Sequence, residues 1–369
     1  MLPNPSILTM LGAFVLVLGP LVVLHELGHY LVGRLFGVRA DAFSVGFGKE
    51  LAGFTDRCGT RWKLSLLPLG GYVQFAGDMN PASMPDPANA ASPEPGTFQA
   101  AKLWQRALIV LAGPMMNLLV AVAIFASFNM MYGKPLADPV VGTVAAGSAA
   151  QAAGVRPGDR VIAIDGATIA RWDEIAPRIA LYPGKTLRLD IERGGAPVSL
   201  GAKVADVVER DRFGNETHRG LLGIGPAEFK YVPVGPFEAA RLGVRQSFGV
   251  MGVMVTGLKQ IIVGDRSVSE LGGPIKIAKF SGEQLTLGWP EFVSFAALIS
   301  INLAFINLLP IPALDGGHLA FYAAEAVRRK PLGARSQEWA FRTGLAFVLA
   351  LMLFVTLNDL AGLPIFGHR

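Results

Sequence analysis

The chain has 369 residues, of which 51% are hydrophobic and 17% charged, and its mean hydropathy of +0.43 indicates a membrane protein with a modest soluble part. The formal charge of +5 comes without a dense run of Lys and Arg, so it disfavours nucleic-acid binding and suits basic loops beside anionic lipid. Because Cys58 is the only cysteine, an internal disulfide and a cysteine-rich metal site are excluded, and any metal ligands must be His, Asp or Glu.

The first predicted element is an apolar run from Ile7 to Leu35, which is long enough to cross a bilayer. We expect residues 1–36 to form the first transmembrane helix. The run is not a removable signal peptide, because it lacks a basic n-region and its apolar core is too long. Its polar cluster, His25 to His29, lies near its C-terminal end.

This cluster reads His-Glu-Leu-Gly-His, and residues four apart lie on one face of a helix. His25 and His29 could therefore hold a zinc ion between them, while Glu26 takes a proton from a water on the metal. The alternatives are a chance match to a short pattern, or a buried histidine pair satisfied by hydrogen bonds. Polar groups at membrane depth are costly, which favours the metal site.

Residues 37–106 are predicted to hold a β-hairpin and a loop. Residues 41–48 and 60–67 alternate apolar with small or polar side chains, as strands do, and residues 68–73 close the segment. The hairpin is either an ordinary surface element or one whose edge pairs with an extended substrate. Residues 77–97, rich in Pro, Ala, Ser and Asn, predict a mobile loop.

The second predicted span runs from about Ala107 to Met131, within a segment 107–138. It contains the sequence Ala112-Gly-Pro-Met-Met-Asn117. Its Gly and Pro allow another helix to approach closely, and Asn117 must find a polar partner inside the bundle.

Residues 139–228 turn soluble in composition and predict a small α+β domain. We expect strands at 140–145, 159–165, 186–193 and 197–204, and helices at 148–153 and 172–181. Residues 229–290 are intermediate. There, Phe248 to Val263 is apolar but short and interrupted by Lys259 and Gln260, which predicts an amphipathic helix on the membrane surface. Residues 271–278 predict a turn that starts another helix.

Residues 291–369 predict two further spans, from about Phe292 to Leu309 and from about Phe341 to Leu357. Asp315, beside two glycines after the third span, is the natural third zinc ligand and leaves one position open for water. His318 is a competing ligand. Asn302 and Asn307 could bind a substrate backbone or pair with other helices.

Four motifs in this order resemble a bacterial site-2 protease of the RseP type. They are the His-Glu-Leu-Gly-His cluster, the Ala112–Asn117 sequence, a segment at 147–166 that resembles a PDZ domain, and Asn-Leu-Leu-Pro-Ile-Pro-Ala-Leu-Asp-Gly-Gly-His at 307–318. The resemblance implies zinc held by His25, His29 and Asp315, with Glu26 as general base and His318 not a ligand. It also implies regulated intramembrane proteolysis of pre-trimmed single-span proteins, such as anti-sigma factors or remnant signal peptides.

The later part of the soluble segment resembles the PDZ loop that receives a peptide's C-terminal carboxylate. That loop consists of Gly220, Leu221, Leu222, Gly223 and Ile224. The order of elements is similar to that of the permuted PDZ domains of bacterial proteases. Better-known members of the family carry two such domains in tandem, whereas this chain has room for one. A domain that binds nothing is the alternative.

The expected fold is a polytopic α-helical membrane protein with four transmembrane helices, an inserted α+β PDZ domain and a membrane-associated β-hairpin. Lys and Arg concentrate in the loops 34–106 and 328–342, which predicts that both loops are cytoplasmic and that the PDZ domain is periplasmic, in a bacterial inner membrane. A catalytically idle PDZ-bearing scaffold and a transporter are the competing functions. The first is disfavoured by the complete set of site residues, and the second by the lack of a repeat relating the two halves.

Overall fold

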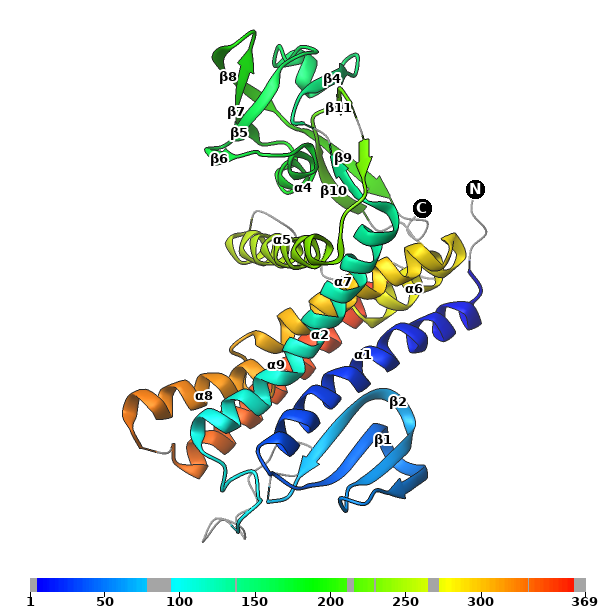
Figure 1. Ribbon diagram of the computed structural model, residues 1–369, viewed down its shortest axis with the longest axis vertical. Helices are drawn as coiled ribbons and strands as arrows, with labels where there is room; N and C mark the ends of the chain where they lie inside the picture. The colour runs from blue at the N-terminus through cyan, green and yellow to red at the C-terminus, as the bar shows by residue number, and fades with distance from the viewer. Residues whose placement is uncertain are drawn as a thin grey trace. The chain divides into compact units, whose positions relative to one another are not determined.

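The computed structural model describes residues 5–77, 94–136, 138–210, 216–228, 230–264, 272–330 and 332–361 (Figure 1). Most of the loop predicted at 77–97 lies outside these residues. The chain divides into two compact units. The first comprises residues up to Phe125 together with Gly272–Asp359, and the second comprises Ala126–Leu271 with the C-terminal residues.

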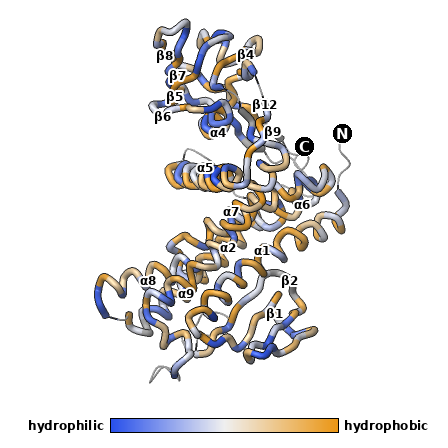
Figure 2. The backbone as a smooth tube through the Cα atoms, viewed as in Figure 1, coloured by the Kyte–Doolittle hydropathy of each residue, from blue (hydrophilic) through white to orange (hydrophobic). Residues whose placement is uncertain are grey.

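The first unit is built mainly from helices, of which the longest are largely apolar (Figure 2). They are α1 (Ile7–Leu35), α2 (Leu103–Tyr132, the last turns of which belong to the second unit), α6 (Pro274–Leu287), α7 (Trp289–Leu308), α8 (Asp315–Arg328) and α9 (Ala334–Ala361). The helices α1, α2, α7 and α9 are each long and apolar enough to cross a membrane, and they fall where the sequence predicts spans. The Ser6 hydroxyl starts α1 by accepting from the Thr9 amide.

A sheet made of two long strands follows α1. The strands β1 (Ala40–Thr55) and β2 (Arg61–Phe75) pair antiparallel, but Phe43 pairs with both Trp62 and Val73, and Trp62 also pairs with Phe54. The sheet therefore has four segments, in the order 50–55, 61–65, 42–45 and 71–75. Strands are present at the predicted positions, but the antiparallel pair joined by the turn is 50–55 with 61–65, and the further pairing makes segment 71–75 one of the two sheet edges.

Buried aromatic residues fasten this sheet to α1. Tyr30, the residue after His29 on α1, makes edge-on contacts with Phe43 and Trp62. The Tyr30 hydroxyl and the Trp62 indole also donate to the same carboxylate oxygen of Asp56, at 3.3 and 2.9 Å. The β1–β2 turn, the sheet and the motif-bearing helix thus form one packed body.

The second unit contains small sheets, three short helical segments and one long helix among its described residues. Its strands are β3 (Lys134–Leu136), β4 (Val141–Val144), β5 (Arg160–Ile164), β6 (Ala167–Thr168), β7 (Thr186–Arg193), β8 (Ala196–Lys203), β9 (Ala205–Arg210), β10 (Glu216–Leu221), β11 (Ile224–Pro226) and β12 (Lys230–Val232). Its helices are α3 (Ala149–Ala152), η2 (Trp172–Glu174), α4 (Ile175–Ala180) and α5 (Pro236–Val263). A helix or strand lies at each of the six positions predicted within 139–228.

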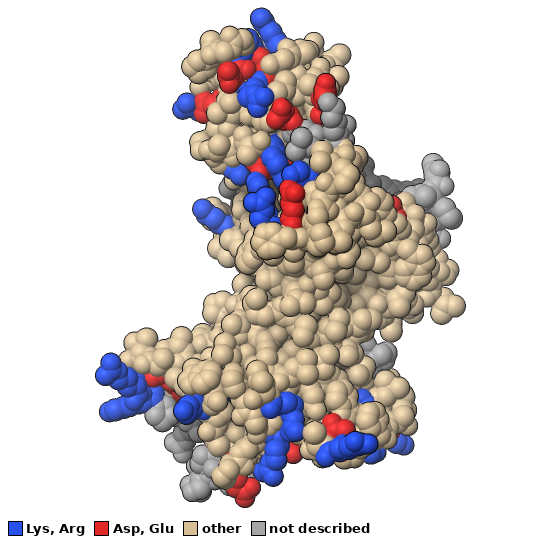
Figure 3. Space-filling view, in the orientation of Figure 1, with Lys and Arg blue, Asp and Glu red and all other residues tan. Residues whose placement is uncertain are grey.

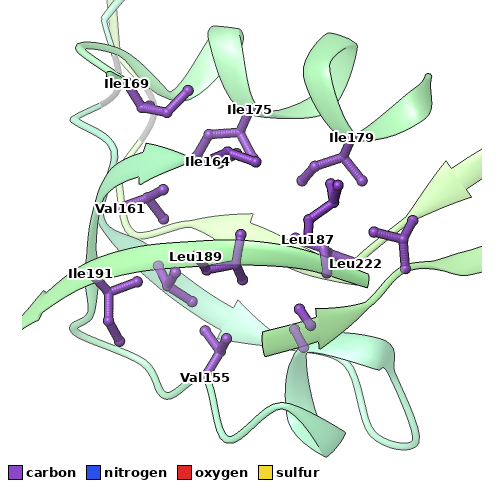
Figure 4. Packing of buried hydrophobic residues seen from close by; sticks show 14 residues of the cluster. Val155, Val161, Ile164, Ile169, Ile175, Ile179, Leu187, Leu189, Ile191 and Leu222 are labelled. Carbon is purple, nitrogen blue, oxygen red and sulfur yellow. The ribbon is translucent and has the colours of Figure 1, made fainter. Parts of the chain in front are cut away.

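The core of this unit lies between α4 and a sheet of order β6-β5-β7-β8. Ile175 and Ile179 project from α4 toward Leu187 and Leu189 of the central strand β7, and Leu222 closes the same cluster (Figure 4). All five are at most 3% exposed. Strand alternation on β7 explains the pattern, because every second side chain faces α4.

The prediction of a short element beginning at Phe248 is wrong in extent. The structure has one helix, α5, from Pro236 to Val263, and its length and composition make it a fifth candidate span. The helix begins with a proline at its first position, and it ends at Gly264, which adopts the left-handed conformation common at helix C-termini. Its placement on the membrane surface stays a prediction.

Candidate metal centre

Three predicted ligand residues meet in the first unit. His25 and His29 lie one turn apart on α1, and Asp315 is the first residue of α8. The Nε2 atoms of the histidines are 3.2 Å apart, and Asp315 Oδ2 lies 3.2 Å from the first and 3.6 Å from the second. His318, the competing ligand, is not part of the group that the structure gathers among its described residues.

These three atoms fit a tetrahedral zinc ion. Zinc binds imidazole nitrogen and carboxylate oxygen at about 2.0–2.2 Å, so two tetrahedral ligands stand about 3.3–3.6 Å apart. Asp315 Oδ2 is also buried and accepts no well-directed hydrogen bond from any described residue. A buried carboxylate oxygen without a partner is costly, and a metal ion would satisfy it.

The two glycines after Asp315 allow the preceding loop to pack closely against the start of α8. A Cβ on Gly316 would lie 2.3 Å from the Leu309 carbonyl oxygen, and one on Gly317 would lie 2.4 Å from that of Ile311. The end of α7 therefore folds back tightly onto the first turn of α8. This contact holds the Asp315 carboxylate toward α1, and it explains why two glycines follow the aspartate.

The second helix approaches the histidines more closely than a side chain would permit. A Cβ on Gly113 would lie 2.2 Å from His29 Nε2 and 2.9 Å from His25 Cε1, while one on Gly28 would meet the Ala112 carbonyl oxygen at 2.5 Å. Gly113 of α2 thus lies against the histidine rings of α1, and Gly28 of α1 lies against the backbone of α2. Sequence reasoning expected a close helix approach at residues 112–117, but not that its partner is the His25–His29 face.

Glu26 lies between the histidines and the sheet. Its carboxylate lies beside the Val73 backbone, and both histidines and Asp315 are within electrostatic reach. A Cβ on Gly71 would lie 3.3 Å from Glu26 Cγ. The sheet edge 71–75 therefore runs directly beside Glu26, which the sequence suggested only as a possible role of a hairpin edge.

The predicted substrate residues fall in two places. Asn302 and Asn307 are half-buried on the last turns of α7, just ahead of the loop that carries Asp315. In the second unit, the loop from Gly220 to Ile224 lines a groove together with Trp172, Ile175, Ala176, Ile179 and Arg219. Gly220 packs onto the Ile179 carbonyl, and Gly223 has φ 77°, so both glycines meet local backbone demands.

Comparison with known proteins gives a consistent result. The chain matches the model of Peptidase family M50 over residues 13–351. A protein of Agrobacterium fabrum and one of Rhizobium meliloti, both named as zinc metalloproteases, are 43% and 46% identical to it. The first alignment covers 95% of each chain, and the second covers 94% of this chain and 95% of the relative. The metalloprotease MmpA of Caulobacter vibrioides is 35% identical, with 97% of each chain covered.

Proposed function

Because the chain belongs to peptidase family M50, whose members are zinc-dependent metalloproteases of the site-2 protease type, we propose that it cleaves membrane-spanning segments inside the lipid bilayer. Its substrates would be single-span proteins already trimmed outside the membrane, as in regulated intramembrane proteolysis. Five helices able to cross a membrane agree with a multi-pass enzyme in a bacterial inner membrane. One observation carries the proposal. The ligand atoms of His25, His29 and Asp315 lie close together beside Glu26, and both histidines belong to the apolar helix α1.

His25, His29 and Asp315 are assigned as the zinc ligands. The distances between their ligand atoms and the unpartnered Asp315 oxygen support this set. His318 lies on the next turn of α8 and is left out of the ligand set. Three protein ligands leave one position for water or substrate, as catalytic zinc sites require.

Glu26 is assigned as the general base. Zinc, when bound, lowers the pKa of a water toward about 7 and polarises the scissile carbonyl. Glu26 takes the proton from the attacking water and returns it to the leaving amine. The position of the carboxylate, between the Val73 backbone and the proposed ligands, supports this role.

The sheet edge 71–75 is proposed to hold the substrate extended. A transmembrane helix hides its peptide bonds in internal hydrogen bonds, so the cleaved stretch must unwind first. An added strand at a sheet edge would replace those hydrogen bonds. The adjacency of Gly71 and Val73 to Glu26 supports this edge over the other, at 50–55. Asn302 and Asn307 would contact the same substrate backbone.

Residues 139–228 are proposed to act as a PDZ domain that filters or senses substrates. The groove between α4 and the Gly220–Ile224 loop has the lining expected for a peptide ending in a free apolar residue. Exclusion of bulky untrimmed substrates would require no peptide binding at all. In both cases the domain would take no part in peptide-bond hydrolysis.

The test compares Glu26→Gln with Asp315→Asn and His318→Ala, each co-expressed with candidate anti-sigma factors. Glu26→Gln should lower cleavage by roughly 100-fold or more while zinc is retained, because only the base is lost. Asp315→Asn should lose cleavage and most of the zinc, and His318→Ala should keep both. Full zinc in Asp315→Asn combined with loss of zinc in His318→Ala would overturn the ligand assignment.

A further inference from the structure

One stripe of α2 has no role in the chemistry above. Ile109, Gly113 and Asn117 are four residues apart, so they lie on one face of the helix. That face lies against the two histidines: Ile109 O is 2.8 Å from His29 Nδ1, and Asn117 Nδ2 is 3.3 Å from His25 Nδ1. Each histidine thus has a partner on α2 for the ring nitrogen that faces away from Asp315.

The Ile109 contact fixes the proton of His29. A backbone carbonyl only accepts hydrogen bonds, so the Nδ1 of His29 must carry the proton and donate it. Its Nε2 then keeps a lone pair on the side of His25 and Asp315. A histidine that ligates a metal through Nε2 needs this tautomer, and the partner of the other nitrogen sets it.

His25 faces a side chain instead of a carbonyl. Asn117 is fully buried, and its backbone carbonyl accepts from the Ser300 hydroxyl at 2.7 Å, which anchors this turn of α2 to α7. With Nδ2 toward His25, the amide donates to Nδ1, and the ring proton must sit on Nε2, 3.2 Å from Asp315 Oδ2. In that orientation Asn117 Oδ1 is buried without a hydrogen-bond partner among the described residues.

We propose that Asn117 is the positioning residue of His25 and presents its Oδ1 to the ring when the metal is bound. The two ends of an asparagine amide have nearly the same shape, so turning the amide over exchanges donor for acceptor without moving the backbone. Oδ1 then accepts a hydrogen bond from His25 Nδ1–H, and His25 Nε2 offers a lone pair to the metal. The same side chain therefore pairs with His25 in either tautomer, with and without metal.

The proposal explains why an amide occupies this position. An aliphatic side chain would leave His25 Nδ1–H buried without an acceptor, which would weaken metal binding through this ring. A carboxylate would accept the proton but would add a buried charge in an apolar helix. The proposal rests on the ligand assignment made above, since it gives His25 its tautomer only if His25 binds the metal.

The test measures zinc affinity of the full-length protein in detergent by competition with a chelator. Asn117→Leu removes the acceptor, and affinity should fall by about 10–100-fold, as for other outer partners of metal-bound histidines. Asn117→Asp keeps an acceptor and should stay within about threefold of wild type. Ser300→Ala is the matched control, because it loosens the same turn without touching His25, and its affinity should be unchanged.

Cobalt supplies a readout that a general packing defect would not move. The visible spectrum of the Co²⁺-loaded protein should change shape in Asn117→Leu and be restored in Asn117→Asp. Wild-type affinity in Asn117→Leu, or equal losses in the Leu and Asp variants, would overturn the proposal. His25→Ala tests the ligand assignment separately from the role of Asn117. If this variant retained zinc, the ligand assignment itself would be wrong.

Discussion

Gly113 shows how a single absent side chain shapes the metal centre. In Gly113→Ala the new Cβ would lie 2.2 Å from His29 Nε2 and 2.5 Å from Cε1, so the imidazole must leave its position. We expect zinc content and cleavage both to fall by at least about tenfold, the lower end of the loss seen when a ligand's support is removed. Metal analysis of the purified variant checks this.

The control for that variant is Gly19→Ala. Gly19 lies on α1 as the histidines do, but a Cβ there meets nothing within 4 Å. The replacement should leave zinc and activity unchanged and stabilise the helix slightly, because alanine loses less entropy on folding. Equal effects of the two variants would show that helix packing in general, and not the space beside the rings, limits the site.

Asp159 and Arg193 provide a pH-dependent contact in the second unit. Asp159 is 1% exposed, and Arg193 donates to both of its oxygens, at 2.7 and 2.8 Å. These hydrogen bonds hold the pKa of Asp159 below its ordinary value. A lowered carboxyl pKa stabilises the fold above the unfolded pKa of about 3.9, and the contribution disappears as the pH falls through the folded pKa.

We therefore expect Asp159→Asn to cost about 1–3 kcal/mol of stability in this unit at pH 7. The difference from wild type should shrink as the pH falls below about 4, because the wild-type carboxyl then becomes neutral as well. Hydrogen exchange of the β5 and β7 amides, compared at matched pH values, measures this. A difference that does not depend on pH would mean that the substitution disturbs packing around residue 159, and not the interaction of the carboxylate charge with Arg193.

At the scale of elements, the predictions succeeded where the signal is local. Long apolar runs gave α1, α2, α7 and α9, and alternation with turn residues gave the strands and helices of residues 139–228. The extent of α5 was underestimated at its N-terminal end, because residues 236–247 include Glu238, Arg241 and Arg245 and form no apolar run, although the backbone there is helical. Helix continuity depends on backbone hydrogen bonds, which polar side chains do not break.

The sequence did not predict the contacts between segments that are distant along the chain. Pairing of Phe43 with both Trp62 and Val73 makes a four-segment sheet from what reads as a hairpin. Nothing local indicates that Val73 would reach Glu26, or that Ile109 would reach His29. The His-Glu-x-x-His spacing and the Asp315 motif did predict side chains that lie together in the structure. Histidine and aspartate are metal-binding residue types, so the sequence itself identifies them as candidates.

At the scale of the molecule, charge predicts topology. On the face shown in Figure 3, the Lys and Arg of the first unit lie over the β1–β2 sheet and the α8–α9 end, and the helices between them are largely uncharged. Both regions should be cytoplasmic. Cys58 is exposed in the β1–β2 turn, so a membrane-impermeant thiol reagent should label it only after cells are opened.

A cysteine introduced at Ser199 in a Cys58→Ser background is the converse probe. Ser199 lies on β8 of the domain expected in the periplasm, and it should react in intact spheroplasts. Protection of Ser199→Cys, or labelling of Cys58 in intact cells, would reverse the assigned orientation.

The proposed filter can be removed cleanly. The chain enters and leaves residues 140–226 at adjacent points, because β3 pairs with β12 and the Ala227 amide donates to the Val140 carbonyl. A short linker can therefore replace the segment. The shortened protein should keep its zinc, still cleave trimmed substrates, and now accept untrimmed ones. Loss of all cleavage with normal zinc content and expression would contradict the filter.

The separation of the ligands along the chain has a consequence for biosynthesis. His25 and His29 leave the ribosome first, whereas Asp315 follows about 290 residues later, which takes roughly 15–60 s at ordinary translation rates. With Asp315 as the proposed third ligand, we expect the nascent protease to stay inactive until α8 has been made and has packed against α1. A chain truncated before Asp315 by premature termination would likewise be harmless to the other proteins of its membrane.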